Sequence, residues 1–313
     1  MRRGVILRID RHRAVAGLRV LAVLALAVWA LTTPGFLTRL SLFSTLTALS
    51  FVGCVAVGMT FITLTGNIMS LALGTTVSAT SLVFLGSLGL GPAAAAIAGL
   101  VFAAAITAAQ GVVIGYFRAN AILVSIAALT LIMGIAEIAT GGQRIYPGGE
   151  NVAFLKTRIW GIPFETVVML GAVLAGQFLL QATRLGREMR MVGSNRRAAE
   201  AAGVNCPAIV TAAYAIAGLT AALTGILLAA RYGSGDMELG AGFDYRAIAA
   251  VLVGGTAIQG GAGSVLRSLL GVAVIAILEI VLRLRGYSET LQYLVTGLVV
   301  LAVIMLQGVG ERR

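Results

Sequence analysis

Residues 91–117 read GPAAAAIAGLVFAAAITAAQGVVIGYF and end a run of 78 residues, Leu40 to Phe117, that contains no charged side chain. A helix needs about 20 apolar residues to cross the hydrocarbon core of a bilayer. Three successive spans therefore fit into this run with tight turns between them. Because open sheet edges and exposed loops are not stable in lipid, the run predicts an all-α, polytopic transmembrane helical bundle.

The composition of the whole chain supports this prediction. Of its 313 residues, 59% are hydrophobic and 11% are charged, and the mean hydropathy is +0.99. Soluble domains average about 45–50% apolar and about 25% charged residues. The net charge of +11 could suggest nucleic acid, but the basic residues cluster in loops, where they fix orientation against the membrane. No exposed domain that could carry a nucleic-acid site is visible.

Ten apolar segments are candidate spans, and no soluble domain or long linker separates them, so residues 1–313 are expected to form one transmembrane domain. The eighth is short for a crossing and is expected to be a broken or tilted helix, which leaves nine spans as the alternative. The candidates are 18–33, 42–63, 67–88, 93–116, 121–140, 166–183, 209–230, 246–259, 268–283 and 290–307.

The distribution of basic residues predicts the orientation. With ten spans and a cytoplasmic N-terminus, fourteen basic residues lie inside and eight outside; without the eighth crossing the count is thirteen against nine. Both counts place residues 1–17, a basic tail, and residues 184–207 in the cytoplasm. The tail and the apolar segment after it look like a signal peptide, but an uncleaved first span is expected because the rest of the chain is also membrane-embedded.

Residues 186–205, GREMRMVGSNRRAAEAAGVN, hold six charged side chains in twenty positions. Ser194 or Asn195 can cap a short helix, and Gly203 can end it in a left-handed conformation. Arg196 and Glu200 are four residues apart and share a face of that helix.

Alanines dominate the rest of the short helix. Ala198, Ala199 and Ala202 are expected to form a smooth side that could enter a groove on another protein. An ordinary solvated loop is the alternative.

Three segments resemble ABC importer permeases. The cytoplasmic coupling loop of that family carries an E-A-A-x-x-x-G pattern, and here Arg197-Ala198-Ala199 is followed by three residues and Gly203, with arginine in place of the glutamate. More narrowly, TRLGREMRMVGSNRRAAEAAGVN (183–205), NAILVSIAALTLIMGIAEIATGG (120–142) and, most specifically, DYRAIAAVLVGGTAIQGGAGSVLRSLLG (244–271) resemble the ribose/xylose/arabinose-type permeases of the branched-chain amino acid permease superfamily. The resemblance covers roughly residues 40–307.

The resemblance implies a bacterial inner-membrane permease for a sugar or similar small polar solute, with no catalytic site and no cofactor of its own. Two permease subunits, identical or paralogous, would form the pathway. Two cytoplasmic ATPase subunits would bind ATP and Mg and hold the coupling loops, and a periplasmic binding protein would deliver the solute. The implied coupling residues are Ser194, Asn195, Arg196, Arg197, Ala198, Ala199, Glu200 and Gly203.

The chain departs from the family at three places. The family's G-G-I-D-L-S-V-G segment reads TGNIMSLALG (65–74) here, without the acid, and Arg246 and Arg267 stand where an acidic residue and a glycine are usual. These differences weaken any transfer of the substrate. A branched-chain amino acid or nucleoside permease therefore remains an alternative.

The run GGTAIQGGAG (254–263) is rich in glycine but lacks the G-K-[ST] ending of a phosphate-binding loop. Glycine here is expected to allow a helix break at membrane depth, which is tolerated where backbone is buried in protein or lines a cavity. A role in gating is the other interpretation. The residues concerned are Gly254, Gly255, Thr256, Gly260, Gly261 and Gly263.

Few titratable groups fall inside the predicted spans. Glu137 is expected to reach water near the outer boundary, and Glu279 is expected to pair with Arg283. An ion-coupled secondary transporter would need more such groups, and a single histidine leaves no catalytic set. Neutral polar residues that could contact a solute or bond helix to helix are Asn67, Ser70, Gln110, Asn120 and Ser125.

Overall fold

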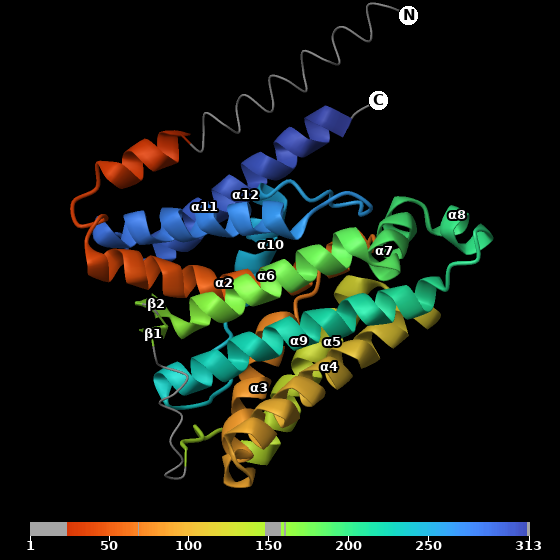
Figure 1. Ribbon diagram of the computed structural model, residues 1–313, viewed down its shortest axis with the longest axis horizontal. Coiled ribbons are helices and arrows are strands. Elements are labelled where there is room, and N and C mark those ends of the chain that lie inside the picture. The colour runs from red at the N-terminus through yellow and green to blue at the C-terminus, as the bar shows by residue number, and fades with distance from the viewer. Residues whose placement is uncertain (1–23, 68, 148–157, 160, 312–313) are drawn as a thin grey trace, which may run out of the picture. The chain divides into compact units, whose positions relative to one another are not determined.

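The structure is a computed structural model that describes residues 24–67, 69–147, 158–159 and 161–311, and almost all of it is helical (Figure 1). Its helices are residues 24–31, α2 (Arg39–Leu64), α3 (Leu73–Gly86), the 3-10 turn η1 (Leu88–Leu90), α4 (Pro92–Tyr116), α5 (Ala121–Thr140), α6 (Phe164–Ala182), α7 (Arg184–Ser194), α8 (Arg196–Ala201), α9 (Cys206–Tyr232), α10 (Phe243–Val253), α11 (Val265–Leu284) and α12 (Glu289–Glu311). Two short antiparallel strands, β1 (Arg158–Ile159) and β2 (Ile162–Pro163), precede α6. The prediction of an all-α fold is confirmed.

Six helices of the described residues are long and apolar enough to cross a membrane: α2, α4, α5, α6, α9 and α11. Each coincides, within a few residues at its ends, with one of the predicted spans. Of the first predicted span, residues 18–23 lie outside the described residues and 24–31 are helical; the last predicted span lies on α12. The chain is therefore polytopic.

The third predicted span, 67–88, is wrong as a continuous helix. Its helix, α3, has only 14 residues, and residues 65–67 and 69–72 before it are not helical. Gly66 and Met69 have positive φ angles of 77° and 40°, which an α-helix does not accommodate. The eighth predicted span is short, as expected: α10 covers 11 residues, and the eleven residues 254–264 separate it from α11.

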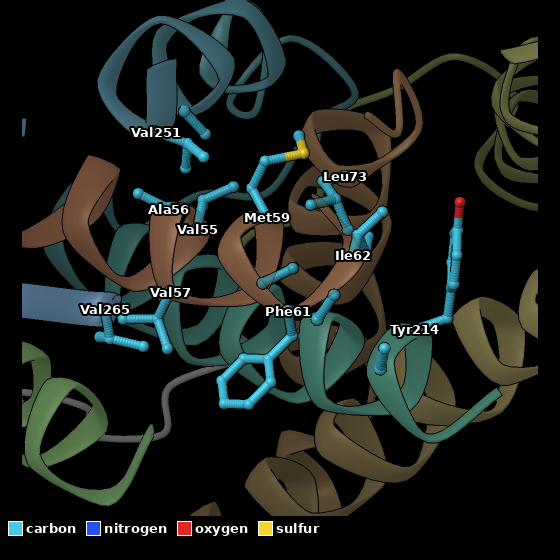
Figure 2. Packing of buried hydrophobic residues seen from close by; sticks show 14 of the residues in the cluster. Val55, Ala56, Val57, Met59, Phe61, Ile62, Leu73, Tyr214, Val251 and Val265 are labelled. Carbon is cyan, nitrogen blue, oxygen red and sulfur yellow. The ribbon is translucent and has the colours of Figure 1, made fainter. Parts of the chain in front are cut away.

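The contacts divide the chain into two compact units, one of which is Leu46–Val272. The core of this unit surrounds the second half of α2, whose residues from Cys54 to Leu64 are all buried. Figure 2 shows several of them, from Val55 to Ile62. Residues of α3, α9, α10 and α11 pack around it, including Leu73, Tyr214 and Val251. α2 is apolar on every side, which is typical of a helix enclosed by other helices.

Helices α4 and α9 pack against each other through glycines (Figure 1). A Cβ atom on Gly111 would lie 2.8 Å from Cα of Thr211, and one on Gly115 would lie 2.8 Å from the carbonyl oxygen of Pro207. Lipid tails are as apolar as these helices, so hydrophobicity alone does not hold the helices together. Close backbone approach supplies the van der Waals contact instead, as the many small residues of the sequence predict.

The second unit holds the described residues before Leu46 and after Val272. Ala30 and Phe36 pack with Ile280 and Val281 of α11 in a small apolar cluster. Arg285 also contacts this cluster through a cation–π interaction, because its guanidinium lies 5.3 Å from the ring centre of Trp29.

Candidate coupling loop and substrate path

The charged stretch 184–205 contains two helices, α7 and α8, where the sequence predicts one. The hydroxyl of Thr183 accepts a hydrogen bond from the Gly186 amide at 3.3 Å and begins α7. Gly186, Met189 and Val192 recur every three residues and are buried against the rest of the unit. α7 is thus an amphipathic helix that the protein holds in a fixed position.

The N-terminus of α8 is capped by Asn195, one of the two residues predicted for this role. Its side-chain oxygen accepts a hydrogen bond from the Ala198 amide at 3.1 Å. Ser194, the other candidate, is the last residue of α7 and donates its hydroxyl to the carbonyl oxygen of Arg190. Asn195 therefore joins α7 directly to α8.

The C-terminus of α8 is closed as predicted. Gly203 has a φ of 80°. Its amide donates to the carbonyl oxygen of Glu200, and the Val204 amide donates to that of Ala199, each at 3.0 Å. This pair of bonds is the Schellman arrangement, which requires the left-handed residue that glycine provides.

We expect Gly203→Val to weaken this helix end by about 1–2 kcal/mol, because a β-branched residue is strained at positive φ. No atom lies within 4 Å of the Cβ position, so the strain comes from the backbone alone. Gly203→Asn is the control, since asparagine tolerates this conformation. Copurification of the ATPase subunit that the family resemblance implies should fall for valine and stay near wild type for asparagine; equal copurification with both variants would contradict the prediction.

Two arginines fix α8 to the end of α4. Arg196 donates to the carbonyl oxygen of Gly115 at 2.8 Å and forms an ion pair with Glu200 at 3.1 Å. Arg118, in the α4–α5 connection, forms an ion pair with the same carboxylate at 3.3 Å. These side chains are engaged within the chain, so they position α8.

The face of α8 that is free to meet another protein differs from the prediction. Ala199 is 1% exposed and belongs to the core of its unit, so the expectation that it lies on the outward side is wrong. Its neighbours Arg197 and Ala198, together with Ala201 and Ala202, are exposed. We call these four residues the α8 outer face.

The predicted helix break between α10 and α11 is confirmed. Residues 254–264 are not helical, and Gly255, Gly260 and Gly261 have φ angles of 82°, 90° and 76°. Residues other than glycine rarely adopt this conformation.

The remaining residues of the break pack closely. A Cβ on Gly254 would lie 2.9 Å from Cα of Ser268, and one on Gly263 would lie 2.6 Å from the methyl carbon of Thr256. Thr256 is fully buried, with its hydroxyl 3.5 Å from that of Ser268, which in turn accepts a hydrogen bond from Thr60 of α2. The break is therefore a well-packed part of the protein, and its role in gating stays a prediction.

Four of the five polar residues predicted to meet a solute bond to a near neighbour in the sequence: Asn67, Ser70, Asn120 and Ser125. Gln110 of α4 differs, because it is 5% exposed and neither atom of its amide has a hydrogen-bond partner among the described residues. The hydroxyl of Tyr214 on the adjacent helix α9 is also buried and also has no hydrogen-bond partner among the described residues. Tyr214 was not predicted, because one tyrosine in an apolar span gives no signal in the sequence.

The N-terminus of α3 receives a carboxylate from a distant part of the chain. Asp244, at the start of α10, accepts a hydrogen bond from the amide of Gly74. Next to it, the hydroxyl of Ser78 accepts a hydrogen bond from the amide of Gly240 at 2.8 Å. The segment 65–74 lacks an acid of its own, and Asp244 supplies one to the free amides of α3.

The two acids of the predicted spans lie in different surroundings. Glu137 is exposed at the end of α5, and its contact with water near the outer boundary stays a prediction. Glu279 is 8% exposed, whereas Arg283 is exposed, and their pairing stays a prediction.

The model of the family described as branched-chain amino acid transport system / permease component matches residues 41–304. The chain belongs to this permease family. It is 32% identical to the ribose import permease protein RbsC of Escherichia coli (strain K12) over 294 residues, which cover 91% of both chains.

Two further relatives point to the same class of transporter. The chain is 31% identical to the ribose import permease protein RbsC of Bacillus subtilis (strain 168), over 93% of this chain and 90% of that one. It is 29% identical to the L-arabinose transport system permease protein AraH of Escherichia coli (strain K12), over 91% and 88%. The chain is thus similar along nearly its whole length to ribose and arabinose permeases, and it is a multi-pass inner-membrane protein.

Proposed function

We propose that this permease is the membrane subunit of an ATP-driven importer that moves a sugar or similar small polar solute into the cytoplasm by alternating access. The observation that carries the proposal is the similarity to ribose and arabinose permeases over about nine-tenths of each chain. The loop of α7 and α8 supports it, because a short helix that is held at both ends and exposed on one side can dock into another protein.

In this proposal the α8 outer face meets a cytoplasmic ATPase subunit, which binds ATP and Mg. A second permease subunit, identical or paralogous, completes the pathway, and a periplasmic binding protein delivers the solute. The proposed coupling residues are the eight that the sequence analysis names between 194 and 203. Among them, Ala199 and Arg196 hold α8 in place.

The topology that we propose has ten crossings and a cytoplasmic N-terminus. In it, residues 234–264 make one crossing, formed by the turns before α10, α10 itself and the break after it. The ion pair of Arg118 with Glu200 supports this orientation, because both residues fall in segments that the basic-residue distribution assigns to the cytoplasm. A cysteine at exposed Ser194 should react with an impermeant thiol reagent only from the cytoplasmic side.

A branched-chain amino acid or a nucleoside is the second candidate for the solute. The matching family is named for branched-chain amino acid transport, and the segment 65–74 lacks the acid seen in sugar permeases of this type. The test is to copurify the complex from its host, identify the ligand of the binding protein, and measure ATP-dependent uptake of that ligand in proteoliposomes. Uptake of a sugar supports the first candidate, and uptake of leucine or a nucleoside replaces it with the second.

We expect Glu137→Gln to leave ATP-driven uptake near the wild-type rate, because the carboxylate is exposed at the end of α5. In an ion-coupled transporter, intramembrane acids act as relays and their removal stops transport. Uptake should be measured with ATP present and an ionophore added. Loss of uptake in the variant, with normal assembly, would favour ion coupling over the ATP-driven importer.

A further inference from the structure

Three segments that are far apart in the sequence meet at four glycines. They are the end of α2, the end of α7 and the break between α10 and α11, and the glycines are Gly66, Gly193, Gly260 and Gly261. The amide of Gly261 donates to the carbonyl oxygen of Leu64 at 2.9 Å. We call this contact the glycine junction.

The junction brings backbone against backbone. A Cβ on Gly193 would lie 2.5 Å from the amide nitrogen of Gly261, and one on Gly260 would lie 2.5 Å from both the nitrogen and Cα of Gly66. A Cβ on Gly261 would lie 2.8 Å from the nitrogen of Ser194. Atoms so placed overlap, and because backbone atoms lie within 2.8 Å of each of these three Cβ positions, rotation of a side chain alone cannot make room.

At Gly193 glycine is required only because there is no space for a side chain, whereas the other three glycines of the junction also have an unusual backbone conformation. Gly66, Gly260 and Gly261 all have positive φ angles, which alone favour glycine. Gly193 lies inside α7 with an ordinary helical conformation, so only the close approach of its neighbours requires it to be glycine. This residue is therefore specific to the contact between α7 and the break.

The junction connects the α8 outer face to the helix break through contacts with little freedom. Asn195 ends α7 and caps α8, so a displacement of α8 moves the end of α7. Gly193 and Ser194 at that end touch Gly261 directly. Close-packed contacts pass on displacement instead of absorbing it.

The break is connected onward to α3. The break follows α10. Asp244, in the first turn of α10, accepts a hydrogen bond from the amide of Gly74 at the start of α3. A Cβ on Gly74 would meet the carbonyl oxygen of Gly240, so here too the backbones are in contact. α10 and α3, with 11 and 14 residues, are each shorter than a full membrane span, and both are thereby linked to the junction.

We propose that the glycine junction passes movement of the ATPase-docking helix to the break between α10 and α11, and that Gly193 and Gly261 are positioning residues for solute transport. The inference rests on the proposed function of α8. Neither residue touches the ATPase in this proposal, so they affect the coupling of hydrolysis to transport and leave docking unchanged.

The test uses Gly193→Ala in the complete transporter, reconstituted with its ATPase and binding protein. ATPase association should stay within about twofold of wild type, while solute transported per ATP hydrolysed should fall about tenfold, because overpacking displaces the contact. Gly171→Ala is the matched control: Gly171 lies inside α6 with no atom within 4 Å of the Cβ position, and all its readouts should match wild type.

Unchanged transport per ATP in Gly193→Ala would overturn the proposal. A loss of ATPase association in parallel with transport would also overturn it, because the junction would then only hold the structure together. Failure of the wild-type chain to bind any ATPase would instead refute the proposed function itself.

A second measurement decides the matter if Gly193→Ala does not fold. Ala262 is exposed in the break, and Ala262→Cys can report on its movement through the rate of thiol labelling. We expect this rate to change when a non-hydrolysable ATP analogue is added to the assembled transporter, and to stay constant when the docking variant Ala198→Glu replaces the wild-type α8. Equal rates with and without nucleotide in a transporter of wild-type activity would show that the break does not respond to the ATPase.

Discussion

Ala198→Glu should fold normally and lose association with the proposed ATPase subunit, whereas Ala199→Glu, one residue further on, should strongly destabilise the fold. The two alanines differ only in their surroundings: Ala198 lies on the α8 outer face, and Ala199 is 1% exposed within the core. The same substitution therefore tests the docking surface at one position and the packing of α8 at the other.

For Ala198→Glu the new carboxylate stands in the first turn of α8. Negative charge is favourable near a helix N-terminus, by about 0.3–1 kcal/mol, so the helix itself is not weakened. A larger, charged side chain at the centre of a docking surface should lower ATPase association by at least about tenfold, or 1.4 kcal/mol. Solute-stimulated ATP hydrolysis and uptake should fall with it.

For Ala199→Glu the carboxylate would be buried. An uncompensated buried charge costs about 3–5 kcal/mol, a large share of the stability of a typical domain. The amount of monodisperse protein in detergent should drop sharply, and a thiol-reactive dye should reach the buried Cys54 at a lower temperature.

Gln143→Glu, at an exposed position after α5, is the control for an added charge and should behave as wild type. Normal uptake by Ala198→Glu would show that the outer face does not dock the ATPase. A stable, fully active Ala199→Glu would show that α8 turns its other side to the protein.

Local chemistry in the sequence is sufficient to predict α8 and both its ends. Asn195 caps through its own side chain, and Gly203 ends the helix through its own backbone, so neither depends on distant residues. The side of α8 that faces inward could not be predicted, because Ala198, Ala199 and Ala202 are identical in chemistry. That choice depends on Arg118, which contacts Glu200 from 82 residues away in the sequence.

The same distinction explains the error in the third span. Residues 67–88 contain no charged side chain and belong to a long apolar run, so hydropathy gives no sign that residues 65–67 and 69–72 are not helical. The break is compensated by contacts from elsewhere: Gly260 packs on Gly66, and Asp244 bonds to Gly74 across 170 residues. In the second broken span, by contrast, the run of glycines at 254–263 is local and visible, and there the break was predicted.

The glycines show how far composition alone can be interpreted. Forty glycines predict close helix packing in general, and the contacts of Gly111 and Gly115 confirm it. They do not reveal that Gly193 differs from Gly171, which also lies inside a helix. Only the position of the neighbouring backbone separates a glycine required for contact from one that could be alanine.

Arg231→Met should destabilise the protein by about 2–3 kcal/mol, because it leaves the carboxylate of Glu165 buried without its partner. The two side chains form an ion pair at 2.9 Å between α9 and α6, and the Glu165 side chain is 3% exposed against 44% for Arg231. This partial exposure of the arginine, and the position of Glu165 in the first turn of α6, keep the expected loss below that of a fully buried pair.

A double-mutant cycle separates the pair from the packing of its members. Glu165→Gln removes the buried charge, so adding it to Arg231→Met should recover part of the loss, with a coupling energy of about 1 kcal/mol or more. The stability of each variant can be measured in detergent from the temperature at which Cys54 becomes reactive. A coupling energy of zero would mean that Glu165 is stabilised by α6 alone.

The pair of Arg184 and Glu188 on α7 is the control for this cycle. Its atoms are closer, at 2.6 Å, but the arginine side chain is 84% exposed, and water competes for both charges. Exposed pairs four residues apart on a helix contribute about 0.3–0.5 kcal/mol. If the shorter, exposed pair couples more strongly than the longer, buried one, then distance rather than burial determines the strength of ion pairs in this protein, and the expected cost of losing Arg231 is wrong.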